Sequence, residues 1–377
     1  MRVLDLSKPL PSDLSAEAVL IYTTVDATLD GVLSQFAARG IRVFGTTSFK
    51  GVFTPRGFAR GAWGLVWEKS DGVKIAHALV QTAAADAQRD VENAARALEA
   101  TLGAKPEAVL VHATPGFEER VIEGLAGAGW HKGVPVFGGS AADDDLSGSW
   151  RIFDNDASLG EGVLIAALVS ERPVYGAFVS GYFGTKRAGR ITRCEGRTVH
   201  TIEHRPAAEV LDEWMDGALK NARVDGGVVL AETTLCPIGR VIDRTHNVPR
   251  YLLSHPHLVH ADTQSVSFFT EFAEGDEIEV MMGSRDSLLD RTGQVVRRAL
   301  RRAERPTLMG GVLIYCGGCV GAIENDVDDV TQIYSKELNG APFLGAATFG
   351  EIGTFSVDRE LVVRHGNLMC DTLLFGR

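Results

Sequence analysis

Two short segments near the C-terminal end of the chain carry the side chains best suited to chemistry. Cys316 and Cys319, with two glycines between them, form a CxxC pair. A position at the end of a buried strand can lower a thiol pKa and favour redox or metal chemistry. Glu351 follows an apolar run within Phe-Gly-Glu-Ile-Gly. A desolvated carboxylate there could accept a hydrogen bond from a ligand amine or act as a general base.

Each of these features also has a simpler interpretation. A structural zinc site normally needs a second pair of ligands, and Cys236 and Cys370 are isolated, so we predict no metal. The CxxC segment then reads as a glycine-rich ligand loop or as a redox-active dithiol. Glu351 can also be an ordinary carboxylate of a turn or of a helix N-terminus.

A third polar segment follows an apolar run in the middle of the chain. Gly138, Gly139 and Ser140 are followed two residues later by three consecutive aspartates, 143–145. Such an acidic triplet could hold an ammonium group or a divalent cation, because hard cations take carboxylate oxygens. The spacing does not match an EF-hand loop, so an exposed acidic turn stays the alternative.

The elements that must position these residues repeat three times. Each copy has an apolar strand, a helical stretch and a second strand that ends at glycine and small residues. The copies span residues 18–48, 108–141 and 311–348. Continuous apolar runs are typical of strands buried on both faces, and about 30 residues is the usual size of a βαβ crossover. Glycine or Asn-Gly ends the helix of each copy, at Gly40, Gly129 and Asn339-Gly340.

The remaining sequence predicts further strands and helices. Alternating patterns favour strands over 57–78, 150–193 and 226–282, and helical spacing predicts helices over 83–102, from Pro206, and over 288–303. The fold class expected is therefore α/β, with two α/β domains whose mixed sheets are built around repeated βαβ units. We place the boundary near residues 195–205, which gives domains of residues 1–198 and 199–377.

Ligands of open α/β sheets bind at the carboxyl ends of the strands. Small residues there let a ligand approach the backbone, and hydroxyls can orient a polar or carboxylate-bearing ligand. Tight turns would use the same residue types, but their repetition at matching positions favours a site. The predicted ligand-binding residues are Thr46, Thr47, Ser48, Thr114, Gly139, Ser140, Asp144, Cys316, Gly317, Cys319, Thr348, Gly350 and Glu351.

Composition excludes several classes of protein. The net charge of −11 argues against a broad phosphate-binding face, so we expect no nucleic-acid partner. No apolar run approaches the roughly 20 residues that span a bilayer, and the first residues lack a signal-peptide pattern. Five cysteines are too few for a disulfide framework, so we expect a cytoplasmic protein with no membrane association.

Familiar catalytic signatures are missing from the sequence. There is no Gly-x-Ser-x-Gly elbow, no Walker loop and no Gly-x-Gly-x-x-Gly after the first strand. Hydrolase, NTPase and dinucleotide functions therefore lack their usual markers. His255, His257 and His260 cluster, and Cys236-Pro237 is the pair found in haem-regulatory motifs, so haem stays an option without being the expected cofactor.

Taken together, these motifs resemble the FIST family. Residues 137–144 resemble the glycine-serine-acid motif of the FIST N domain, and residues 344–353 resemble the Gly-Glu-Ile-Gly signature of the FIST C domain. The segment from Ile314 resembles its Ser-Cys-x-Gly-Arg stretch, and Pro206 with its helix resembles the join between the domains. The chain departs from the family at Cys319, where arginine is more usual, and at residues 46–50, where the acid of a Cys-Thr-x-Gly-Glu stretch is missing.

The resemblance implies an intracellular sensory role. Small ligands such as amino acids, and signalling partners such as a histidine kinase, belong to that implication, as do haem-based nitric oxide sensors. Three functions follow for this chain. The leading one is a small-ligand sensor without turnover; the second is an enzyme that uses Cys316, Cys319 and Glu351 in the crevice between the domains; the third is a haem-based gas sensor.

Overall fold

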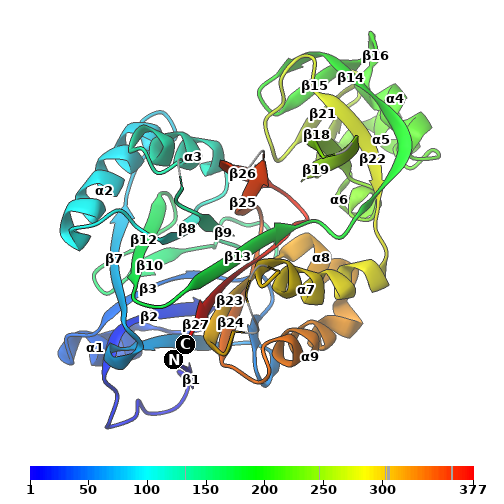
Figure 1. The fold of residues 1–377 in the computed structure, drawn as a ribbon. Helices are drawn as coiled ribbons and strands as arrows, with labels where there is room; N and C mark the ends of the chain where they lie inside the picture. The colour runs from blue at the N-terminus through cyan, green and yellow to red at the C-terminus, as the bar shows by residue number, and fades with distance from the viewer. Residues whose placement is uncertain (132, 246, 302, 304–305, 358–359) are drawn as a thin grey trace.

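The computed structural model describes residues 1–131, 133–245, 247–301, 303, 306–357 and 360–377. Within these ranges the strands form three six-stranded sheets and one nine-stranded sheet. The six-stranded sheets make up a body, and the nine-stranded sheet forms a separate lobe (Figure 1). The chain is therefore α/β, as the sequence predicts, with parallel and antiparallel strands mixed in the sheets of the body.

The body consists of three repeats of one unit. The first contains β1 (Arg2–Asp5), β2 (Ala16–Thr23), α1 (Asp30–Ala38), β3 (Arg42–Thr47), β4 (Val52–Thr54), β5 (Gly57–Ala59) and β6 (Ala62–Glu68). The second contains β7 (Val73–Val80), α2 (Ala87–Leu102), β8 (Ala108–Ala113), α3 (Glu118–Gly127), β9 (Val136–Ser140), β10 (Ile152–Asp154), β11 (Ser158–Leu159) and β12 (Val163–Ser170).

The third repeat is interrupted by the lobe. It contains β13 (Val174–Val179), α7 (Arg285–Ala299), β23 (Leu308–Cys316), α8 (Gly317–Ala322), α9 (Val327–Glu337), β24 (Phe343–Thr348), β25 (Glu351–Val357), β26 (Glu360–Gly366) and β27 (Cys370–Gly376). The helix predicted over 288–303 thus begins earlier, because Ser284 caps it by accepting a hydrogen bond from Ser287 N. Of that prediction, Arg302 lies outside the described residues.

The three sheets share one layout. The predicted βαβ units are confirmed, because β2 and β3, β8 and β9, and β23 and β24 pair in parallel. In every sheet two antiparallel strands flank the first strand of this pair, and a hairpin flanks the second. The hairpin always comes from another repeat: β10–β11 joins β3, β25–β26 joins β9, and β4–β5 joins β24. This exchange ties the repeats together.

Glycine stands at the same position of each second strand. Gly45, Gly138 and Gly345 are the equivalent residues, paired in register with Ile21, Val111 and Leu313. A Cβ atom at Gly45 or Gly138 would overlap the carbonyl oxygen of the paired residue. The repeated glycine is therefore required by the close approach of two backbones.

The sheets bury their inner faces against one another and their outer faces under helices. The central core draws on all three sheets, with Phe44, Phe137 and Leu344 at equivalent positions. Helix α1 packs on the first sheet, α2 and α3 on the second, and α7 and α9 on the third. Strands of such sheets are buried on both faces, which explains the continuous apolar runs of the sequence.

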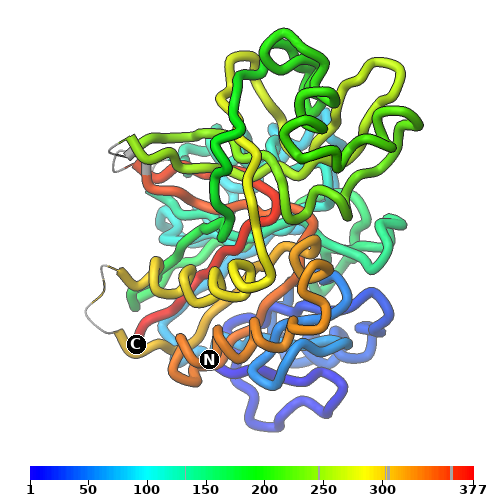
Figure 2. Tube along the Cα trace, turned by 90° about the vertical axis from the view of Figure 1, so that its right-hand side faces the viewer, coloured from blue at the N-terminus to red at the C-terminus, as the bar shows by residue number. Residues whose placement is uncertain are grey.

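The lobe lies between β13 and α7. Its elements are β14 (Phe183–Glu195), β15 (Thr198–Ile202), β16 (Arg205–Pro206), α4 (Ala207–Trp214), α5 (Lys220–Asp225), β17 (Gly227–Val228), α6 (Leu230–Thr233), β18 (Ile238–Thr245), β19 (Val248–Ser254), β20 (Pro256–His260), β21 (Ser265–Phe268) and β22 (Glu277–Met282). Its first and last strands pair at Phe183 and Met282, so the chain enters and leaves the lobe side by side (Figure 2). Among the described residues, no helix has the length and apolar character needed to cross a membrane.

The close approach at the repeated glycines can be tested by substitution. Gly138→Ala should lower the free energy of unfolding by about 3 kcal/mol or more, because the new Cβ would overlap Val111 and the backbone there has φ +138°. Gly31→Ala is the control, because Gly31 lies in α1 with open space around it and should gain about 0.5 kcal/mol. Urea denaturation measures both; equal effects would contradict the packing described.

Candidate functional site

A cavity of about 760 Å³ lies between the body and the lobe. This is the size of a small-molecule site, and most of its wall is apolar, as such sites usually are. The body contributes mainly loop residues that follow strand ends, and the lobe covers them. The lining includes Phe49, Gly116, Glu118, Asp144, Leu146, Trp150, Cys316, Gly317, Phe349, His365 and Asn367 from the body, and Arg197, Leu230, Thr234, Leu235, His255, His257 and Phe269 from the lobe.

Aromatic rings form one wall of this cavity. Phe349 packs against both Phe49 and Trp150, with ring centroids 5.8 and 6.2 Å away. On the lobe side His257 stacks on Phe269 at 4.6 Å. Such rings offer a large apolar surface to a ligand with little loss of conformational freedom.

Charged groups from body and lobe meet at another part of the wall. Helix α3 begins with Glu118 and Glu119, and Arg197 of the lobe pairs with both, 2.9 Å from Glu118. Glu119 also accepts a hydrogen bond from His365 Nδ1 at 2.9 Å. Glu118 accepts bonds from Gly116 N and from the hydroxyl of Ser140. The lobe is thus joined to the body by an ion pair at the cavity wall.

These contacts change the pKa values of the two acids. Burial alone would raise the pKa of each carboxyl, but attraction to His365 and Arg197 outweighs burial and holds both pKa values below the ordinary 4.5. The two carboxylates in turn raise the pKa of Arg197 against the effect of its own burial. All three groups are therefore charged at neutral pH, and a ligand that enters meets both signs of charge.

The two carboxylates and His365 could also be considered as metal ligands, because their ligand atoms lie within 4.8 Å of one another. Arg197 already occupies the carboxylates, and its guanidinium would repel a cation at the same place. The arrangement fits an ion pair better than a metal site.

The strand ends predicted to form the site do converge, but they bind one another. Ala142 N donates to Thr47 O, Ala347 N donates to the hydroxyl of Ser48, and Ser140 N donates to Gly350 O. These three bonds join the first repeat to the second, the first to the third, and the second to the third. The ends are consequently packed together as the floor beneath the cavity.

The hydroxyls predicted to contact a ligand are buried and have partners inside the protein. Thr46 and Thr47 donate to Arg151 O, Ser48 to Gly51 O and Thr114 to Gly162 O. Buried polar groups need such partners, so these hydroxyls serve the fold. Of the predicted residues, the structure places Asp144, Cys316 and Gly317 in the cavity wall. Gly139, Ser140, Thr348, Gly350 and the fully buried Cys319 lie behind it.

Glu351 is buried at the start of β25 and does not line the cavity. By register it is the equivalent of Val52 and Ile152 in the other two hairpins, which are apolar. Its carboxyl accepts hydrogen bonds from Thr348 and from Met369 N, both at 2.9 Å. Burial nevertheless raises the pKa of Glu351 to about 8.

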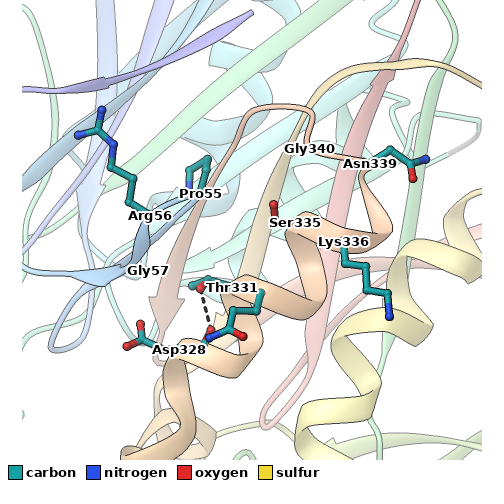
Figure 3. A pocket seen from close by; sticks show the side chains of 10 residues that line it. Pro55, Arg56, Gly57, Asp328, Thr331, Ser335, Lys336, Asn339 and Gly340 are labelled. Carbon is teal, nitrogen blue, oxygen red and sulfur yellow. Dashed lines mark hydrogen bonds between the residues drawn. The ribbon is translucent and has the colours of Figure 1, made fainter.

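A second, shallower hollow lies between α9 and the β4–β5 hairpin (Figure 3). Its walls carry Arg56, Asp328 and Thr331. Asp328 accepts a hydrogen bond from Phe58 N at 2.7 Å, and Thr331 donates to Asp328 O. The bond from Phe58 N to Asp328 joins the exchanged hairpin to the helix, so this part of the hollow is explained by the fold.

Several residues of the cavity wall are not predicted from the sequence. Glu118 and Glu119 begin the helix that follows the repeated strand β8 after four residues, which is a signal that could have pointed to them. Arg197 is a single arginine in a hairpin turn of the lobe, with nothing local to mark it. Its partner Glu118 is 79 residues away, and only the fold brings the two together.

The fold and cavity define a class: an α/β protein with a ligand-sized cavity between a threefold-repeated body and an inserted lobe. Comparison with known families finds the FIST N domain over residues 17–205 and the FIST C domain over residues 207–354. The chain belongs to the FIST family, whose domains act in signal transduction.

Other comparisons add little. No curated protein matches the chain significantly. Among solved structures, it matches the structure of PurLQS from Thermotoga maritima with 10% identity, a TM-score of 0.22, and coverage of 81% of this chain and 73% of that one. A similarity of this size carries no argument about function.

The ion pair at the cavity wall predicts a stability that depends on pH. Arg197→Gln should cost roughly 3 kcal/mol near pH 7, because it leaves the buried Glu118 without its cationic partner and Glu119 with His365 alone. Since the folded pKa values of Glu118 and Glu119 are depressed, the pair stabilises above about pH 4.5 and loses that effect as pH falls. The difference between variant and wild type should therefore shrink in acid. Arg205→Gln, which removes two exposed ion pairs within the lobe, is the control and should change little.

The buried carboxyl of Glu351 should make the stability of the protein depend on pH in the opposite direction. Its folded pKa of about 8 exceeds the ordinary 4.5, so the folded protein keeps a proton that the unfolded chain releases. Stability should therefore fall as pH rises from about 5 to 8. Glu351→Gln should remove this loss, so the stability of the variant relative to the wild type should rise by up to about 1.4 kcal/mol per pH unit. Denaturation curves at several pH values measure it, and a constant difference between the two proteins would mean that Glu351 is ionised.

Proposed function

We propose that this protein is a cytoplasmic sensor that binds a small metabolite, an amino acid or a related compound, in the cavity between body and lobe. The observation that supports this most is the composition of the cavity wall. Carboxylates and a guanidinium stand at one part, and Phe49, Trp150 and Phe349 at another. An amino acid carries an ammonium and a carboxylate on one end and a side chain on the other, which matches this arrangement.

Binding at this position can be communicated to a partner. The ligand would touch the lobe and the body at once, so it would favour the arrangement in which they are joined by Arg197. We propose that a signalling protein, such as a histidine kinase, reads that state. The family's role in signal transduction supports this reading.

A haem-based function is a second candidate, favoured by His257. This histidine lines the cavity and stacks on Phe269, and its imidazole would be the group that holds the iron if haem were bound. The other two cavity histidines fit less well: His255 Nε2 hydrogen-bonds to Leu230 O at 3.2 Å, and His365 Nε2 is buried against Gly350. A visible spectrum after haem reconstitution, compared between wild type and His257→Ala, separates this function from metabolite binding.

The metabolite proposal is tested by a thermal-shift screen with amino acids and related compounds. A ligand at 100 times its Kd should stabilise the protein by about 2.7 kcal/mol. Gly321→Phe places a ring at the cavity wall where a new side chain meets open space, so it should abolish the shift without unfolding the protein. Gly321→Ala is the matched control and should keep the shift. The proposal fails if no compound stabilises the wild type, or if Gly321→Phe responds equally.

A further inference from the structure

A buried arginine lies beneath the cavity without a carboxylate partner among the described residues. Arg291 of α7 is fully buried. Its Nη1 donates to Leu368 O at 2.6 Å and to Ser180 O at 3.1 Å, whereas Nε and Nη2 make no hydrogen bond to a described residue. The guanidinium lies 4.0 Å from the ring centroid of Tyr315. A buried charge is costly unless an opposite charge accompanies it, so an anion is expected nearby.

Cys319 is the acidic group whose electrostatic interaction with Arg291 is the strongest, and as a thiolate it would be this anion. Its thiol is fully buried, interacts electrostatically with Arg291, and lies 3.5 Å from the hydroxyl of Tyr182. Burial opposes ionisation, but the hydrogen bond from Cys316, the charge of Arg291 and the hydrogen bond from Tyr182 outweigh it. Together they lower the pKa of Cys319 to about 6.

Cys316 holds the proton of the pair. Burial and its hydrogen bond to Cys319 raise the pKa of Cys316 well above its ordinary value. Cys316 is also the member of the pair that lines the cavity, with 3% of its surface exposed. Gly318 places no side chain over the Cys316 sulfur, which a Cβ there would approach within 3.7 Å. A molecule in the cavity can therefore reach Cys316, while Cys319 stays behind it.

We propose that Cys316 and Cys319 form a redox-active dithiol whose substrate is a small disulfide entering the cavity, with Arg291 as the positioning charge. Cys316 passes its proton to Cys319 and attacks one sulfur of the disulfide R–S–S–R, whose S–S bond breaks and releases RS⁻. This thiolate takes the proton and leaves as RSH. Cys319, again a thiolate, attacks the Cys316 sulfur and releases the second RS⁻.

The reaction balances in electrons and in S–S bonds. Two electrons pass from the protein sulfurs to the small disulfide, one S–S bond forms between Cys316 and Cys319, and one is broken in the substrate. Oxidation removes the anion beside Arg291, so the buried charge stabilises the reduced form. This makes the protein disulfide more oxidising than a pair without the arginine. The inference does not rest on metabolite sensing, since it concerns only these thiols and a disulfide.

The experiment equilibrates the full-length protein with bis(2-hydroxyethyl) disulfide and its thiol at graded ratios, followed by alkylation under denaturing conditions and mass spectrometry. The reduced chain should take five alkyl groups, one per cysteine. The oxidised chain should take three, on Cys194, Cys236 and Cys370. In Cys319→Ser, a mixed disulfide on Cys316 should accumulate because nothing resolves it, whereas Cys194→Ser should leave the equilibrium between Cys316 and Cys319 unchanged.

Arg291 is tested by two substitutions at the same position. Arg291→Met should shift the equilibrium toward the protein disulfide at least tenfold, which corresponds to about 30 mV, and Arg291→Lys should keep most of the wild-type value. If Arg291→Met does not fold, two results still test the proposal. These are the equilibrium of Arg291→Lys compared with the wild type, and the mixed disulfide on Cys316 in Cys319→Ser. The proposal is overturned if Cys316 and Cys319 remain reduced, and are therefore alkylated, at every ratio of disulfide to thiol. It is also overturned if Cys319→Ser forms no mixed disulfide on Cys316.

Discussion

The hydrogen bonds that join the three strand ends are the constraint on which the site depends. Thr47, Ser140 and Ala347 each end or nearly end a second strand, and each contributes to a bond with another repeat. Because these ends satisfy one another, they are buried, and a ligand cannot reach them. The residues just beyond them are carried outward instead, and these residues, Phe49, Asp144 and Phe349 among them, form the wall of the cavity.

The features that could support binding or redox chemistry are those in which the third repeat differs from the other two. Only the third repeat carries an inserted lobe, and the lobe covers the floor formed by the strand ends, which creates the cavity. The third repeat also replaces the apolar residue of the hairpin by Glu351, where Val52 and Ile152 stand in the others. The CxxC pair begins at the last residue of the first strand of this repeat, and Cys316 stands where the first repeat has Thr24 and the second has Thr114. A scaffold of three similar parts thus supports an asymmetric site.

The sequence predicts the repeats well because their cause is local. About 30 residues of sequence contain every feature of one repeat: an apolar strand, an amphipathic helix, and a second strand with an obligatory glycine. The helix ends at a residue in the left-handed conformation, such as Gly40 or Gly129. The hairpin exchange is not visible, because β25 meets β9 over more than 200 residues of chain. For the same reason Arg197 and His365 carry no local sign of their shared partner Glu119.

Predictions for the site residues were limited in another way. The strand-end rule selected hydroxyls such as Ser48 and Thr114, and the rule cannot tell a hydroxyl that faces a ligand from one that faces a neighbouring strand. Burial and hydrogen-bond partners decide this, and both depend on the assembled repeats. The rule located the site better than it identified the residues of the site. The cavity lies beside the strand ends, and the residues that line it follow those ends by a few positions in the sequence.

We propose above that a metabolite binds in the cavity between body and lobe. The most direct measurement is a crystal structure of the protein grown with the compound that stabilises it most. Density for the compound is expected between the ring of Phe349 and the Arg197–Glu118 pair, in contact with both body and lobe. Density for the compound elsewhere, with the cavity filled by solvent alone, would contradict it.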